Sequence, residues 1–402
     1  MTENLADFLR QEGALPSRPG VRRRQHPKGW EPGVEWSGAQ GTLTTEPVDV
    51  MPDWDALLGV WGLDPAQYEV DGTPQFRAWD GIVKNKEGYS ETRRLFYYKA
   101  TIRRRLRAAI DDAELRRLFA HPPRKAAAST VKSSRALTVG LSDWQIGKGE
   151  GGGSAGTVER LVQKLGIIDT VLRDAAKRRD PYEQVVLACM GDLIEGCSGH
   201  YAMQTFQVDL DRREQERVTR RVLAEYVRRI APLTQRLIVA AVPGNHGENR
   251  ANGKAYTTWS DNSDLSVVEG VAEVVKDRPG FEHVSFVIAD RLTLTLDVCG
   301  VIVGLAHGHA GRATDASKMA RWWGGHALSG QPIGDAQILI TGHYHHLKVD
   351  ESTGRTWIQV PAMDGGSAWW TESSGQDSLS GMMLVDVGAS LGARGWHNVR
   401  VI

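Results

Sequence analysis

The sequence predicts a layered α/β protein, with central β-sheets flanked by helices and a small N-terminal α+β module. Two observations carry this prediction: five uninterrupted apolar runs recur in the second part of the chain, and three long segments with helical periodicity lie between them. Continuous apolar runs are typical of strands that are buried on both faces. Helices of this length can cover such a sheet, so a layered domain follows.

The expected strands and helices can be assigned to ranges. The apolar runs, each counted with the polar residues that follow it, are ALTVGLSD (136–143), QVVLACMGD (184–192), RLIVAAVPGNH (236–246), VIVGLAHGH (301–309) and AQILITGHYHH (336–346). The helical patterns cover 157–179, 211–233 and 262–277. These elements define a domain that we expect to span residues 135–402.

Residues 1–134 differ from this domain in composition and in hydrophobic patterning. Residues 1–50 are rich in Pro, Gly and Arg and lack apolar periodicity, which predicts a flexible arm. Residues 51–134 are expected to form the small basic α+β module. It would begin with short helices broken at Gly62 and Pro65, followed by a strand pair with a turn at 86–88. A basic helix and a Pro-containing linker that ends near Ser134 would complete it.

Composition narrows the class of protein. Of the 402 residues, 41% are hydrophobic and 24% are charged, which is typical of a folded globular chain. No run is apolar for the roughly 18 residues that a membrane span needs, so we expect a cytoplasmic protein without a membrane partner. The three cysteines, Cys189, Cys197 and Cys299, form no C-x-x-C pair, which argues against a disulfide framework and a thiolate zinc site. The oligomeric state stays open, a dimer included.

Charge is unevenly distributed although the formal net charge is zero. From Arg93 to Arg135 there are 13 Lys or Arg against 3 Asp or Glu, and Phe96, Tyr97 and Tyr98 lie within this run. Such a run is usually a solvated helix face. Arginines beside aromatic residues are also what phosphate-backbone binding and base stacking require, so we favour a nucleic-acid-binding role for the module.

Candidate metal ligands follow the predicted strands. They are Asp143, Gln145, Asp192, Glu195, Asn245, His246, His307, His309, His343, His345 and His346. Loops at the carboxyl ends of strands converge on a site in α/β domains. Carboxylate, amide and imidazole ligands suit divalent ions such as Mn, Fe or Zn. Strand alternation would place Asp143 and Gln145 on one face, and likewise His343 and His345.

These motifs resemble the calcineurin-like metallophosphoesterase superfamily, whose pattern is D-x-H, G-D-x-x-D/E, G-N-H-D/E, H and G-H-x-H in that order. The resemblance runs from Asp143 to His345, about half of the chain. It implies the layered metallophosphoesterase fold and two divalent ions. The first ion would be held by Asp143, Gln145, Asp192 and His345, and the second by Asp192, Asn245, His307 and His343. His246 would contact the phosphate or protonate the leaving group.

Two positions depart from the pattern. Gln145 stands where the family has His, which replaces an imidazole by a neutral amide and predicts a weaker first site that favours Mn. Gly247 stands where an acid follows the His, so another residue, conceivably Glu248, has to orient His246. We expect His309 and His346 to lie outside the ligand set. His200 is either a substrate contact or a plain loop residue.

The resemblance implies a phosphoester hydrolase in which a metal-activated bridging hydroxide attacks phosphorus. The G-N-H-x-E and H-G-H blocks look most similar to the branch that holds the nuclease subunit of double-strand-break repair complexes and related phage-encoded phosphoesterases. This similarity and the basic module favour a Mn-dependent phosphodiesterase with nuclease activity on DNA. The alternatives are a phosphomonoesterase or small-molecule phosphodiesterase, and a scaffold that keeps the fold with little turnover.

Overall fold

The chain divides into two compact units, residues 1–107 and 108–402. The computed structural model describes residues 26–37, 40–66, 68–84, 89–104, 112–118, 134–201, 204–251, 253–312, 315–366, 371–372 and 379–402. The predicted turn at 86–88 and most of the predicted linker lie outside these ranges, as do residues 1–25 of the predicted arm. The borders predicted at 50/51 and 134/135 stay predictions.

The N-terminal unit is built on a four-stranded antiparallel sheet with strand order β1-β2-β4-β3. Its strands are β1 (Gly33–Ser37), β2 (Gln40–Thr44), β3 (Tyr68–Lys84) and β4 (Ser90–Arg104). The predicted strand pair is therefore present, and it is joined by two strands from the region expected to be an arm. Helix α2 (Trp54–Val60) packs Leu58 against Leu43 and Ile102 of the sheet, and Asp53 caps its N-terminus.

The second unit contains the layered α/β domain. A six-stranded sheet has the order β10-β7-β6-β5-β16-β17, and a five-stranded sheet has the order β11-β12-β13-β15-β14. The strands are β5 (Ala136–Leu141), β6 (Gln184–Cys189), β7 (Arg236–Ala241), β10 (Val284–Ile288), β11 (Thr293–Val298), β12 (Val301–Ala306), β13 (Ile338–Thr341), β14 (Lys348–Ser352), β15 (Arg355–Gln359), β16 (Met383–Val387) and β17 (Trp396–Val401). All five predicted apolar runs form strands, and β5, β6 and β13 are buried along their whole length.

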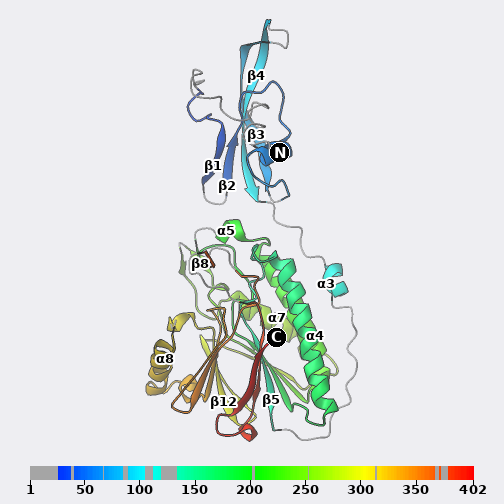
Figure 1. The fold of residues 1–402 in the computed structure, drawn as a ribbon, viewed down its shortest axis with the longest axis vertical. Coiled ribbons are helices and arrows are strands. Elements are labelled where there is room, and N and C mark those ends of the chain that lie inside the picture. The colour runs from blue at the N-terminus through cyan, green and yellow to red at the C-terminus, as the bar shows by residue number, and fades with distance from the viewer. Residues whose placement is uncertain are drawn as a thin grey trace, which may run out of the picture. The chain divides into compact units, whose positions relative to one another are not determined.

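Helices cover both outer faces of this pair of sheets (Figure 1). The predicted helical segments form α4 (Gly153–Lys177), α6 (Arg212–Ile230) and α7 (Ser263–Lys276), which share one core with the six-stranded sheet. A second core lies between the two sheets and includes Val186 and Ile340. A third packs α8 (Ala316–Leu328) against the five-stranded sheet through Trp323 and Trp357. The predicted layered α/β class is therefore confirmed.

The other elements named in the described part of the chain are short. They are α3 (Asp112–Leu118), α5 (Gln204–Gln207), the strands β8 (Arg250–Ala251) and β9 (Lys254–Ala255), and 3-10 helices of a single turn. Among the described residues, no helix is long and apolar enough to cross a membrane.

Candidate metal centre

The predicted ligands lie in the loops that follow β5, β6, β7, β12 and β13. Strands β5, β6 and β7 are parallel, and so are β12 and β13, so within each sheet these loops emerge at a common edge. Backbone hydrogen bonds join the loops to one another. The amide of Gln145 donates to Asp192 O at 2.9 Å, and the amide of His246 donates to Asp192 Oδ1 at 2.8 Å.

One group of side chains has the geometry of a metal site. Asp192, His307 and His343 each offer a ligand atom, and these atoms lie within 4.8 Å of one another. His307 Nε2 lies 2.9 Å from Asp192 Oδ2 and 3.1 Å from Asn245 Oδ1. The other ring nitrogen, His307 Nδ1, is 2.7 Å from the carbonyl oxygen of Met190. A backbone partner on Nδ1 fixes the tautomer that presents Nε2 to an ion, so these residues fit a divalent metal.

The electrostatics of this group follow from burial and proximity. Burial opposes a charge on Asp192, but the His307 and His246 imidazoles outweigh it and hold the pKa of the carboxyl well below its usual range. Burial also opposes a charge on His307, and Asp192 outweighs it and raises the pKa of His307 to about 9. Burial and the adjacent His307 lower the pKa of His343 to about 4.

The remaining predicted ligands form a second half of the site. His345 Nε2 lies 3.1 Å from Asp143 Oδ1, and Asp143 Oδ2 accepts from the His343 amide at 3.1 Å. Gln145 is buried, and its Oε1 lies 3.5 Å from Lys148 Nζ. Of the described His, Cys, Asp and Glu residues, no other three have ligand atoms as close together as those of the first group.

The backbone at the ligands is unusual. Asp143, Gln145, Asp192, His343 and His345 all have positive φ, between 45° and 73°. A non-glycine residue rarely adopts this left-handed conformation, and such strain concentrates at functional sites. The expectation that strand alternation aligns Asp143 with Gln145 is therefore wrong, as is the same expectation for His343 and His345. Both pairs lie beyond their strands, where the chain has turned.

Two glycines permit close approach of the backbone to the ligands. A Cβ at Gly244 would collide with Asp192, and a Cβ at Gly342 would collide with Ser142 Oγ and Asp143 Oδ2. In each half of the site, a carboxylate thus lies directly against a glycine. A side chain at either glycine would displace that carboxylate.

Asp264 is a structural part of the site that the sequence did not reveal. Its buried carboxylate accepts hydrogen bonds from the amides of Asp192 (2.9 Å), Leu193 (2.9 Å), Ile194 (3.4 Å) and Gly244 (3.0 Å). It lies in the first turn of α7, which Asn262 caps. Four backbone donors from two loops therefore converge on one side chain, which fixes the loops that carry Asp192 and Asn245. The only signal in the sequence was an ordinary helix-start pattern, N-S-D.

His246 is oriented by Glu195. His246 Nδ1 lies 2.8 Å from the Glu195 carbonyl oxygen and 3.3 Å from Glu195 Oε2, and Tyr201 donates to Glu195 Oε1 at 2.8 Å. Burial alone would lower the pKa of His246, but Glu195 and Asp192 outweigh it and raise that pKa to about 10. Glu248, which we considered for this role, instead pairs with Arg250 at 2.6 Å.

Two further histidines, His200 and His309, lie beside residues of the site. The His200 ring stacks on His246 with centroids 4.3 Å apart and planes 2° apart. The His309 ring lies 5.4 Å from the His307 ring, whereas His346 is exposed and has Nδ1 2.6 Å from the carbonyl oxygen of Tyr344. His200 therefore lies against the predicted general acid.

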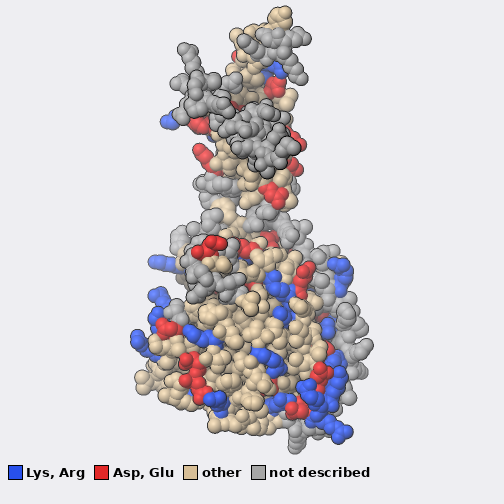
Figure 2. All heavy atoms as spheres, in the orientation of Figure 1, with Lys and Arg blue, Asp and Glu red and all other residues tan. Residues whose placement is uncertain are grey.

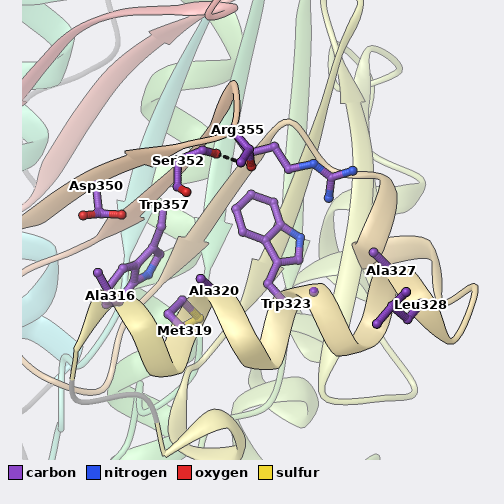
Figure 3. A pocket seen from close by; sticks show the side chains of 12 residues that line it. Ala316, Met319, Ala320, Trp323, Ala327, Leu328, Asp350, Ser352, Arg355 and Trp357 are labelled. Carbon is purple, nitrogen blue, oxygen red and sulfur yellow. Dashed lines mark hydrogen bonds between the residues drawn. The ribbon is translucent and has the colours of Figure 1, made fainter.

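A separate pocket lies between α8 and the strands β14 and β15 (Figure 3). Trp323, Arg355 and Trp357 line it, and the Arg355 guanidinium lies 5.5 Å from the centre of the Trp323 ring. None of the residues that line this pocket is a predicted ligand, so it does not belong to the candidate metal centre.

Comparisons with known proteins give fold-level similarity only. No protein-family model matches the sequence, and no curated protein matches it. Among solved structures, Vps29 of Entamoeba histolytica complexed with zinc has 14% identity and a TM-score of 0.32, covering 66% of this chain and 98% of its own. An archaeal phosphodiesterase has 10% identity and a TM-score of 0.29, covering 66% and 99%. A predicted phosphoesterase of Streptococcus pneumoniae has 11% identity and a TM-score of 0.26, covering 63% and 83%. Similarity at this level does not establish a shared activity.

Proposed function

We propose that this chain is a metal-dependent phosphoester hydrolase of the calcineurin-like metallophosphoesterase superfamily. The observation that carries the proposal is the close grouping of Asp192, His307 and His343, with Asn245 Oδ1 beside His307. The ordered motifs of the sequence and the left-handed backbone at five ligand positions support it.

The predicted ligands fall into two sets, one for each ion. Asp192, Asn245, His307 and His343 would hold one divalent ion, and Asp143, Gln145, Asp192 and His345 would hold a second. When bound, such ions supply Lewis-acid activation of water and neutralise charge on the phosphate oxygens. Mn is the ion that we expect first, with Fe and Zn as alternatives, because the donors are oxygen and imidazole nitrogen.

His246 is the proposed general acid. Its Nε2 lies 3.9 Å from Asp192 Oδ2, so the ring faces the group of ligands, while Nδ1 is held by Glu195. The raised pKa keeps the imidazole protonated near neutral pH, in the form that can donate a proton to a departing alkoxide. The Glu195 carboxylate keeps the ring oriented during that transfer.

DNA is the substrate that we propose, with cleavage of phosphodiester bonds. The N-terminal unit offers an aromatic surface for base stacking, because Phe76, Phe96 and Tyr98 form a cluster with ring centroids 5.8–6.1 Å apart, and Phe76 is 62% exposed. The charges of the N-terminal unit favour DNA binding less than the sequence predicted, because some of its arginines form ion pairs. Arg94 pairs with Asp80 at 3.2 Å, and Arg103 pairs with Glu69 at 3.0 Å.

The visible face of the second unit adds no uniform basic surface. Figure 2 shows Lys and Arg interspersed with Asp and Glu across it. We propose that the aromatic cluster and phosphate contacts within the metal centre contribute to affinity for DNA.

The test is hydrolysis by the full chain with Mn²⁺, using labelled single- and double-stranded DNA and bis-p-nitrophenyl phosphate. We expect metal-dependent cleavage of both, abolished by Asp192→Asn. Cleavage of the small diester alone would support the hydrolase and overturn the DNA substrate. A chain that cleaves neither substrate but binds metal would favour a scaffold that has kept the fold.

A further inference from the structure

We propose that Lys148 makes the two halves of the metal centre unequal. Its ammonium group supplies a positive charge beside Gln145 and beside the Asp364 carboxylate that adjoins His345. This charge weakens ion binding in the half formed by Asp143, Gln145 and His345, while the half at His307 and His343 binds tightly. This inference deepens the proposed function, because it concerns the order in which the same site takes up ions.

The position of Lys148 carries the proposal. Its side chain is only 11% exposed, and Nζ forms an ion pair with Asp364. The other oxygen of Asp364, Oδ1, lies 3.7 Å from His345 Nδ1. Lys148 Nζ also lies 3.5 Å from Gln145 Oε1. The ammonium group therefore contacts one predicted ligand and shares a carboxylate with another.

The loop that carries Asp364 is attached to the site. The amides of Met363 and Asp364 donate to the Asp143 carbonyl oxygen at 3.0 and 3.2 Å. Asp364 is buried, with 3% of its surface exposed, so its charge needs a partner. Lys148 provides that partner. Removing Lys148 would take away the ion-pair partner of Asp364 and leave more negative charge next to His345, which would attract a cation to this half.

The backbone fixes Lys148 where it acts. Its amide donates to Gln145 O at 3.0 Å, and the amide of Gly149 donates to Gln207 O at 2.5 Å. Arg160, another nearby cation, is engaged differently, because it donates to the carbonyl oxygens of Met363 (3.1 Å) and Gly151 (3.0 Å). Arg160 holds the loop in place, whereas Lys148 balances its carboxylate.

The amide ligands of the two halves differ in what they face. Gln145 and Asn245 are both neutral amides, but the carbonyl oxygen of Gln145 faces the Lys148 ammonium, whereas that of Asn245 lies 3.1 Å from His307 Nε2. In a partly buried site, two unit charges about 4 Å apart interact strongly even after screening by solvent and salt. We therefore expect the Lys148 charge to lower the Mn²⁺ affinity of its half of the site by about 10- to 100-fold. The Lys148 charge therefore favours stepwise occupation.

The experiment measures Mn²⁺ bound per chain without substrate, by equilibrium dialysis with elemental analysis and by electron paramagnetic resonance. The wild-type chain should bind one ion tightly and a second only at about 10- to 100-fold higher free Mn²⁺. Lys148→Met should bring the two affinities together and give the signal of a coupled ion pair at low Mn²⁺. Lys148→Arg keeps the charge and should behave as the wild type.

Lys177→Met is the matched control. It removes the same charge from the last turn of α4, roughly 36 Å along the helix from its start near the site, and should leave both affinities unchanged. Melting curves identify a variant that fails to fold, and Lys148→Gln then serves as the second neutral variant. Two equal affinities in the wild type, or no tightening when the charge is removed from a folded chain, would overturn the proposal. Neither result bears on whether the chain hydrolyses phosphoesters, because no substrate is present.

Discussion

The two halves of the proposed metal centre are built from similar residue types and differ in the charged groups that lie beside the ligands. In one half, Asp192, Asn245, His307 and His343 gather around a common point, and a backbone carbonyl fixes the tautomer of His307. In the other half, His345 pairs with Asp143, and the Lys148 ammonium lies against Gln145 and forms an ion pair with Asp364. The difference indicates that a shared motif order does not require two equivalent sites.

The halves also depend on different supports. Asp264 in α7 anchors the two loops that carry Asp192 and Asn245 through four backbone hydrogen bonds. The second half relies on the segment at Met363 and Asp364, whose amides bind Asp143. Apart from substitutions at the shared Asp192, a substitution in one half should therefore leave the other largely intact.

The largest effect is expected at Asp192, because it is the ligand common to both halves. Asp192→Asn should reduce hydrolysis of bis-p-nitrophenyl phosphate by more than about 100-fold, since even residues behind the ligands cost about 10- to 100-fold in metalloenzymes. Initial rates at saturating Mn²⁺ measure this. Asp290→Asn, at an exposed position, is the matched control. Activity near wild type in Asp192→Asn would contradict the assignment.

A large effect without loss of metal is expected at His246. His246→Ala should lower the rate by about 100- to 10,000-fold, the usual contribution of a general acid, and should leave the Mn²⁺ content unchanged. Rates and elemental analysis on the same preparations separate the two effects. Loss of Mn²⁺ together with activity would show that His246 acts as a ligand instead.

A stability effect is expected at Asp264. Asp264→Ala leaves four buried amides without their acceptor, which should lower the free energy of unfolding by about 3 kcal/mol or more. Urea unfolding with and without Mn²⁺ measures it, and Mn²⁺ should restore less stability to the variant than to the wild type. A loss below about 1 kcal/mol would contradict the anchoring role.

The smallest effects on stability and Mn²⁺ binding are expected from substitutions of Gly244 and Gly342. Gly244→Ala forces the backbone away from Asp192, and Gly342→Ala forces it away from Asp143, each at a cost of about 1–3 kcal/mol. Gly244→Ala should weaken Mn²⁺ binding at His307 and His343, and also in the other half through the shared Asp192, whereas Gly342→Ala should weaken it only at Asp143 and His345. The opposite pattern in calorimetric titrations would reverse the assignment of the halves.

Local patterns in the sequence were enough to predict the strands and helices. The continuous apolar run at 184–192 predicted a strand buried on both faces, and it contains β6, which is buried along its whole length. The helical pattern at 211–233 contains α6, which Asp211 caps. The same logic failed just beyond the strands. Alternation could not orient Asp143 and Gln145, because both residues adopt the left-handed conformation after β5 ends.

Contacts between distant residues account for the rest. Glu195 orients His246, although Glu248 is much closer in sequence, because the loop after β6 folds back against the loop after β7. Asp364 reaches Lys148 across 216 residues. Periodicity and motif order carry no information on such pairs, since tertiary packing alone brings them together.

The most direct test of the account is an anomalous difference map from crystals grown with Mn²⁺, with data collected at the manganese absorption edge. The account predicts a strong peak within bonding distance of Asp192, Asn245, His307 and His343, and a weaker peak or none beside Asp143 and His345 at low Mn²⁺. A map with no peak at His307 and His343, or with its strongest peak beside Lys148, would contradict it.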